Sequence, residues 1–188
     1  MKGHLGHYNL FEWWTQSFTE SEKVRFKELY KPMGGSFNDL INGNGSYMES
    51  AVWFLTGLAG FASNKSDLSI ALKFLEKAES LIKKSTILDK HFLYGTLSER
   101  HYKLREDIDH YAKAIYYCKK QIEIAGFVKK EFIKEFGDNK VKHWGYYQLT
   151  IILQKEKKYK EAILLCEKAM EQGWKGDWEN RIEKLKKY

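Results

Sequence analysis

A chain of 188 residues with 43% hydrophobic residues suits one domain, or one domain with an appended subdomain, and argues against global disorder. It holds a single proline in a composition rich in Lys, Glu, Leu and Ala, so we expect helices. The net charge of +7 falls almost wholly after residue 90, and two cysteines are too few for a disulfide scaffold or a thiolate zinc site.

The first part of the chain, residues 1–46, is predicted to be an N-terminal helical cap with a glycine-rich loop. The opening residues lack the apolar core of a secretory leader, so we expect a cytoplasmic protein. Thr19 and Glu22 have the spacing of a capping box, in which hydroxyl and carboxylate bind each other's exposed backbone N–H groups. This box should begin a short helix that ends before Pro32. Glycines then mark a loop around a short helical piece, 36–41.

A bulky aromatic patch precedes this short helix and consists of Phe11, Trp13, Trp14 and Phe18. Large aromatic residues are favoured both in cores and at the energetic centres of interfaces. The patch therefore has two interpretations. It packs in the core against the first helical hairpin, or it forms a docking surface for a homodimer or another partner.

The region after residue 46 is repetitive. A second capping box, Ser46 to Glu49, precedes the apolar run 51–62, which is too short to span a bilayer, so no membrane association is expected. Three segments, 67–79, 110–122 and 158–170, then echo one another.

The three segments share small and apolar residues at matched positions. The aligned sets are Ala71, Leu75 and Ala78; Ala114, Cys118 and Gln121; and Ala162, Cys166 and Ala169. Offsets of four and seven lie on one helical face, and small residues there let a neighbouring helix approach closely. A polar turn precedes each segment, and another apolar-rich helix precedes each turn. The pattern predicts three helical hairpins.

These hairpins resemble tetratricopeptide repeats, which are helical hairpins of about 34 residues that stack into a superhelix. The resemblance covers roughly residues 47–174, and the last hairpin matches best, with Tyr146, Leu149 and Leu153 on its first helix. The spacing departs from the family, because the aligned alanines are 43 and 48 residues apart. The second excess contains 127–137, where Val128, Phe132 and Phe136 fall four apart on one helical face, which predicts an added or extended helix.

The tail, 175–188, is predicted to be a capping helix. It should begin at Asp177, a good N-cap residue, and present Trp178, Ile182 and Leu185 along one face. A solenoid needs such a helix to cover its last apolar face. We therefore expect an all-α superhelix, or solenoid, of about three tetratricopeptide-like hairpins with an N-terminal helical cap and a C-terminal capping helix, joined as one compact unit.

Tetratricopeptide domains usually bind extended peptides or partner helices on the concave surface lined by their first helices. By motif position, the resemblance implies a partner-binding groove made of Trp53, Thr56, Phe92, Thr96, Glu99, Trp144, Tyr147, Gln148 and Ile151. The alternative is that some of these side chains are simply buried. The carboxylate clamp of chaperone-binding members has no counterpart, since its places hold Thr56, Gly60, Tyr147 and Ile151. An aromatic, moderately polar groove is more consistent with an apolar peptide or helix.

The resemblance thus implies a non-catalytic adaptor or regulator that binds a protein or peptide, with lysines speeding the encounter with an acidic partner. The alternative is a nucleic-acid-associated protein that uses the basic second half of the chain. Lysines cluster at 155–160 and elsewhere, but they alternate with glutamate and arginine is scarce, so ordinary solubility explains most of them.

Catalytic, cofactor and metal sites are not expected. Phosphate loops, nucleophile elbows and zinc-protease helices have no match in the sequence. Cys118 and Cys166 occupy equivalent hairpin positions, which indicates small core residues rather than nucleophiles. His101 and His110 are nine residues apart, which suggests no metal pair. A cryptic activity in the N-terminal segment is the remaining enzyme alternative.

Overall fold

The structure is a computed structural model that describes residues 3–43, 50–137 and 141–188, with Phe136 described by its backbone alone. These residues are all-helical, which confirms the expected all-α class for the described part of the chain, while the superhelix of tetratricopeptide-like hairpins stays a prediction. No helix among them is long and apolar enough to cross a bilayer. The chain divides into two compact units, unit 1 (Met1–Ser85) and unit 2 (Thr86–Tyr188). The borders that the sequence analysis placed near residues 46 and 174 were drawn from the repeat pattern. They stay a prediction.

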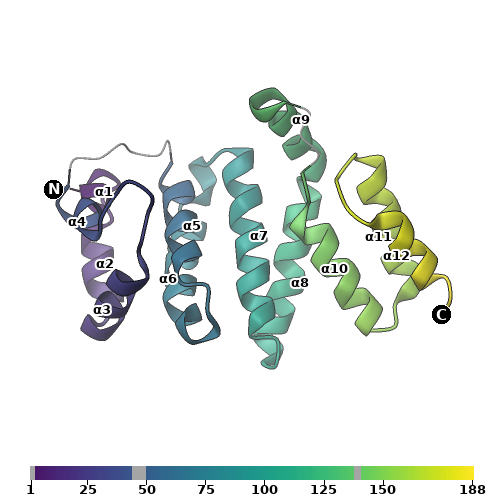
Figure 1. The fold of residues 1–188 in the computed structure, drawn as a ribbon, viewed down its shortest axis with the longest axis horizontal. Coiled ribbons are helices and arrows are strands. Elements are labelled where there is room, and N and C mark those ends of the chain that lie inside the picture. Colours follow the sequence, from purple (N-terminus) through teal and green to yellow (C-terminus); the bar gives the residue numbers. More distant parts are fainter. Residues whose placement is uncertain (1–2, 44–49, 138–140) are drawn as a thin grey trace. The chain divides into compact units, whose positions relative to one another are not determined.

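Each unit contributes six α-helices to the described residues (Figure 1). Those of unit 1 are α1 (Gly3–His7), α2 (Phe11–Ser17), α3 (Glu20–Leu29), α4 (Phe37–Ile41), α5 (Ala51–Phe61) and α6 (Leu68–Ser80), with short 3-10 helices at Lys65–Asp67 and Ile82–Lys84. Those of unit 2 are α7 (Ile87–Lys103), α8 (Ile108–Glu123), α9 (Ala125–Phe136), α10 (Trp144–Lys155), α11 (Tyr159–Glu171) and α12 (Trp178–Leu185).

Helix α3 begins at the first capping box, as expected. The Glu22 backbone N–H donates to the Thr19 hydroxyl at 3.2 Å, and the Thr19 N–H donates to the Glu22 carboxylate at 2.8 Å. The helix ends at Leu29, before the proline. The second predicted box, Ser46 to Glu49, lies outside the described residues, and α5 follows Ser50, whose hydroxyl accepts the N–H of Trp53.

The aromatic patch of the N-terminal segment packs largely inside unit 1. Trp14 and Phe18 are 4% and 3% exposed, and their rings lie 5.9 and 4.9 Å from the ring of Phe74 on α6. Phe26 of α3 contacts the same ring at 4.8 Å. This burial favours core packing against the first hairpin. Homodimer formation through the patch stays a prediction.

Two ion pairs also tie α3 to the helices that follow it. The Arg25 guanidinium donates two hydrogen bonds to the Asp67 carboxylate, at 2.9 and 3.1 Å, and lowers the pKa of that carboxyl. Lys73 on α6 donates to Glu22 at 2.7 Å and to the Ser17 carbonyl at 2.8 Å. A bidentate guanidinium pair fixes orientation as well as position, so the cap segment is held to α6 by specific contacts.

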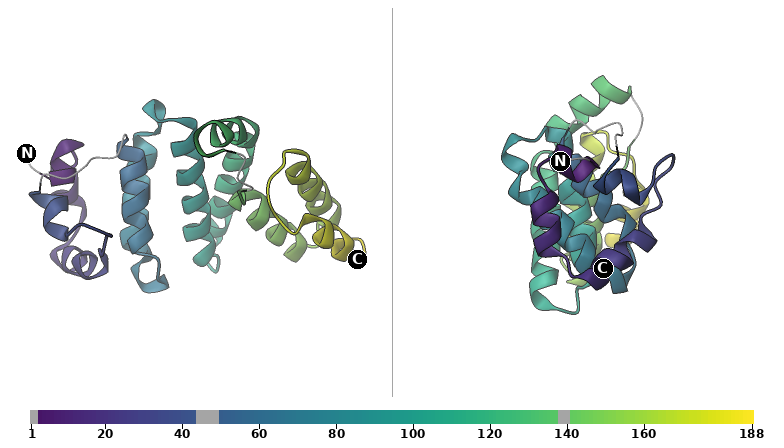
Figure 2. Two further views of the ribbon diagram at one scale, coloured as in Figure 1. Left: turned by 45° about the horizontal axis from the view of Figure 1, so that its top comes forward. Right: turned by 90° about the vertical axis from the view of Figure 1, so that its left-hand side faces the viewer.

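The aligned small residues lie buried on the second helix of each packed pair of helices. Helices α5 and α6, α7 and α8, and α10 and α11 are consecutive and pack as pairs, each within its own unit (Figures 1 and 2). Ala71, Ala114 and Ala162 are completely buried on the second helix of each pair, as are Leu75, Cys118 and Cys166. In unit 2, α10 packs against α7 and α8, and α12 packs against α11 with Trp178 and Leu185 buried.

The added helix predicted at 127–137 is α9, a separate helix that begins directly after α8 (Figure 1). Its residues Val128 and Phe132 are 0% and 7% exposed and belong to the core of unit 2. The side chain of Phe136, the third member of the expected stripe, lies outside the description. Because α9 packs against α7, the additional residues between the second and third hairpins extend the core rather than forming a loop.

Gln121 departs from the alanines at the equivalent positions of the other hairpins, and it joins three helices of unit 2. Its Nε2 donates to the His91 carbonyl on α7 at 2.9 Å, and its Oε1 accepts the Gly145 N–H of α10 at 2.6 Å. Two glycines leave space for it: a Cβ at Gly95 or Gly145 would lie 2.6 or 2.8 Å from the Gln121 amide. The amide thus caps a buried N–H at the start of α10 that has no partner within its own helix.

Candidate functional site

The predicted groove residues fall in both units. Trp53 and Thr56 lie on α5 of unit 1, where Trp53 is 36% exposed and the Thr56 hydroxyl donates to the Val52 carbonyl. The other seven lie on α7 and α10 of unit 2, which pack against each other. The structure therefore brings those seven onto two neighbouring helices, while a groove that continues from α5 stays a prediction.

Three of these residues form one row on α10, here called the α10 face: Trp144, Tyr147 and Ile151. Trp144 and Tyr147 are 37% and 39% exposed, and Ile151 is half-buried. The two aromatic rings lie 6.2 Å apart, and the Arg181 guanidinium of α12 lies 4.3 Å over the Tyr147 ring. A cation held over one aromatic face fixes that ring while its remaining surface stays exposed.

The α7 side of the predicted groove is more enclosed. Phe92 packs against Phe132 of the added helix at 5.7 Å, so α9 takes part of the surface that the sequence assigned to a partner. Glu99 forms ion pairs with Arg100 at 2.8 Å and Lys103 at 3.1 Å. Neighbouring Thr96 is half-buried, and its hydroxyl donates to its own helix.

Gln148 is only 3% exposed, although it was predicted to line the groove. Its Nε2 has no hydrogen-bond partner within the described ranges. Its side chain is therefore part of the packing of α10 and is not presented to solvent beside Tyr147.

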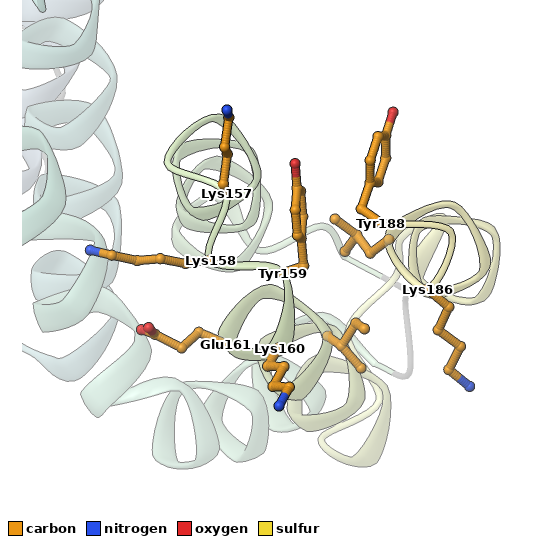
Figure 3. A pocket seen from close by; sticks show the side chains of 9 residues that line it. Lys157, Lys158, Tyr159, Lys160, Glu161, Lys186 and Tyr188 are labelled. Atoms are coloured by element: carbon orange, nitrogen blue, oxygen red, sulfur yellow. The ribbon is translucent and has the colours of Figure 1, made fainter.

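A shallow pocket of about 480 Å³ opens at the turn between α10 and α11 (Figure 3). It is called the basic pocket here, and its lining residues are Lys157, Lys158, Tyr159, Lys160, Glu161, Ile163, Leu185, Lys186 and Tyr188. The rings of Tyr159 and Tyr188 stack at 4.9 Å with an interplanar angle of 15°. The lysines were identified in the sequence but assigned to solubility. The pocket was not predicted, because Tyr188 is distant in sequence and lies beside Tyr159 only in the folded chain.

The basic pocket adjoins the α10 face. A neighbouring hollow of about 340 Å³ is lined by Ile151, Gln154 and Lys155 of α10 together with the same two tyrosines. Ile151 thus belongs to the aromatic row and to the wall of this hollow. Trp144, Tyr147, Ile151 and Gln154 follow one side of α10 towards the lysine-rich turn.

Lys157 has an unusual backbone conformation at this turn, with φ of 59°. Its N–H donates to the Gln154 carbonyl and the Lys158 N–H donates to the Leu153 carbonyl, which is the Schellman arrangement at a helix end. Glycine is the usual residue there, and a side chain in this conformation costs about 1–2 kcal/mol. The end of α11 has the same bonding pattern with Gly173 at the matching position, at φ of 71°.

Two buried histidines form a second cluster of polar groups in unit 2. The rings of His91 and His143 lie 5.0 Å apart, and both contact Trp174. The Tyr146 N–H donates to Nδ1 of His143, so His143 caps α10 as a neutral acceptor. Burial lowers the pKa of His91 to about 4, and burial together with the nearby His91 lowers that of His143 to about 3. Both rings are therefore neutral near pH 7.

His101 and His110 lie together despite their separation in sequence. Their Nδ1 atoms are 2.7 Å apart across the α7–α8 turn, and the His101 ring stacks on Tyr117 at 5.6 Å. Burial and the facing His110 lower the pKa of His101 to about 4. The separation is that of a hydrogen bond, because two imidazoles on one tetrahedral zinc ion at 2.0–2.1 Å would place their nitrogens about 3.3 Å apart.

Both cysteines are free thiols that are completely buried, as expected for core positions. Burial raises the pKa of Cys118 to about 12 and also raises the pKa of Cys166. Neither is an activated thiolate. Across residues 3–43, 50–137 and 141–188, no group of three or more His, Cys, Asp or Glu side chains is placed to hold a metal ion.

The chain matches none of the protein-family models, curated proteins or solved structures with which it was compared.

Proposed function

We propose that this chain is a tetratricopeptide-like helical repeat protein that binds a protein or peptide without catalysis, as an adaptor or regulator. The α10 face is the centre of the proposed site. The proposal extends the resemblance found in the repeat residues, and the paired helices with buried alanines at equivalent positions support it.

The observation that carries this proposal is the exposure of Trp144 and Tyr147 on one side of α10. Large aromatic residues are the most frequent energetic centres of interfaces, because they bury much apolar area at a small entropic cost. Spacing of three and seven residues from Trp144 places Tyr147 and Ile151 on the same helical face, as a bound peptide or helix requires. Arg181 holds the Tyr147 ring in place before a partner arrives.

A peptide library displayed on phage and selected against the full chain tests this proposal. We expect selected peptides to contain apolar residues, and we expect Trp144→Ala and Tyr147→Ala each to weaken binding about 10-fold or more, as for interface centres. Tyr116→Ala is the matched control, since Tyr116 is an exposed tyrosine on α8. Selected peptides that bind all three variants as well as wild type would refute the α10 face as the site.

A nucleic-acid-associated role for the basic second half is the competing function, and salt separates the two. Contacts to phosphate release counterions, so such binding falls steeply as salt rises. Apolar contacts at Trp144 change little over the same range. An affinity for single-stranded oligonucleotides that exceeds the affinity for every selected peptide and vanishes at about 0.5 M salt would favour nucleic acid.

A further inference from the structure

We propose that the basic pocket binds an acidic segment of the partner whose apolar residues contact the α10 face. This inference rests on the proposed function and adds the chemistry and polarity of the ligand. The partner segment carries its apolar residues beside Trp144 and its carboxylates beside the turn that follows α10.

Distance along α10 sets the spacing of such a segment. Trp144 and Gln154 are ten residues apart on one helix, which corresponds to about 15 Å. An extended peptide covers this length in about four or five residues. The ligand should therefore place its carboxylates about that far from its apolar residues.

The lysines of the pocket divide into two groups. Lys158 is paired with Glu156 at 2.7 Å, and Lys155, beside the pocket, donates to the Tyr102 hydroxyl at 3.0 Å. The first contact lies within the turn, and the second joins α10 to α7. Lys157, Lys160 and Lys186 line the pocket without an ion-pair partner in the described part of the chain, and Glu161 is the one acidic side chain in the lining.

The arrangement of these amino groups favours a run of carboxylates over a single phosphate. Figure 3 shows the side chains of Lys157, Lys160 and Lys186 extending in different directions around the tyrosine pair. Positive charge is thus spread over the rim of the pocket and does not converge on one point. Ile163 and Leu185 add apolar side chains to the lining, which suits a peptide with an apolar side chain among acidic ones.

Lys157 supports the same assignment independently. A glycine occupies the matching place at the end of α11, and the fold would accept one here. The lysine is strained at this position, and it lines the pocket. Strain retained at an exposed turn is explained when the side chain contributes to binding.

Two fluorescein-labelled peptides of about twelve residues test the proposal. Both carry a Leu-Phe pair, and the acidic probe has four glutamates about five residues further on where the neutral probe has four glutamines. Fluorescence anisotropy with the full chain should give about 10-fold tighter binding of the acidic probe at low salt. Equal affinities for the two probes would overturn the proposal.

The double variant Lys157→Gly with Lys160→Gln should remove most of the preference for the acidic probe and leave the neutral probe unchanged. Lys168→Gln is the matched control, because Lys168 lies on α11 but does not line the pocket. Lys157→Gly alone should raise Tm by about 1–3 °C, because the relief of a left-handed lysine is partly offset by the greater backbone entropy of glycine in the unfolded chain. Weaker binding with greater stability excludes misfolding as the cause.

The role of the basic pocket and the role of the α10 face can be refuted separately. A preference that depends on Lys157 but not on Trp144 would remove the α10 face and with it the proposal of a single partner. A loss of both probes with Trp144→Ala, but no effect of the lysine variants, would overturn the acidic segment and leave the proposed function intact. Lysine-dependent binding of oligo(dT) tighter than that of the acidic probe would overturn the acidic peptide in favour of nucleic acid.

Discussion

Replacing Gln121 should destabilise unit 2 more than its position on a small-residue stripe suggests. Alanine occupies the equivalent places, Ala78 and Ala169, and it would seem the natural residue for helix packing. In this hairpin, however, the side chain supplies an acceptor to the Gly145 N–H and a donor to the His91 carbonyl. Gln121→Ala removes both groups and leaves space between Gly95 and Gly145.

The magnitude follows from the bonds that are lost. An unsatisfied buried N–H costs about 1–3 kcal/mol, and the space left by the side chain adds to it, so we expect a loss of about 2–4 kcal/mol. Gln121→Met keeps most of the volume but not the hydrogen bonds, and it should cost about 1–3 kcal/mol.

Urea unfolding followed by circular dichroism measures both variants, and a thermal scan of Gln121→Ala should show Tm lowered by about 6–12 °C. If Gln121→Ala stays within about 1 kcal/mol of wild type, the amide does not cap α10 and the reasoning is refuted.

Three further predictions concern unit 2. Gly145→Ala should cost about 1–3 kcal/mol in urea unfolding, because its Cβ would lie 2.8 Å from Gln121 Oε1 and 2.9 Å from the Cys118 carbonyl oxygen; an unchanged midpoint would contradict this packing. His91 and His143 have pKa values lowered to about 4 and 3 from an ordinary 6.5, so the unfolded state binds protons first. Their contribution to the free energy of unfolding is complete above pH 6.5. Below pH 6.5 it should fall by up to about 1.4 kcal/mol for each histidine per pH unit. His143→Asn keeps an acceptor for the helix cap and should flatten this slope in urea unfolding at several pH values, whereas an unchanged slope would count against it. The two cysteines should resist a thiol reagent in the native protein and react only after denaturation, and rapid native labelling would show that they are not buried.

The sequence patterns that proved reliable are local or repeated. The Thr19 capping box was predictable because its partners are three residues apart, and the alanines were predictable because small residues recur at a helical spacing. The added helix α9 was visible through the spacing of Val128 and Phe132. Each of these features depends on neighbours along the chain.

The features that escaped prediction depend on residues brought together by the fold. In the sequence, Gln121 is only a member of the aligned set of the second hairpin, and its cap on α10 needs the third hairpin in place. His101 and His110 meet only because the α7–α8 turn folds one helix back on the other. Tyr188 stacks on Tyr159 only once α12 has packed on α11. The periodicity of residues along a single helix gives no information about such contacts.

Hydrogen–deuterium exchange of the full chain, with and without a peptide selected from the displayed library, tests the central claim most directly. If the α10 face and the basic pocket form the binding surface, the peptide should slow exchange across residues 144–160 and at the end of α12, and leave α8 unchanged. Protection confined to other helices, or no protection at a saturating peptide concentration, would contradict it.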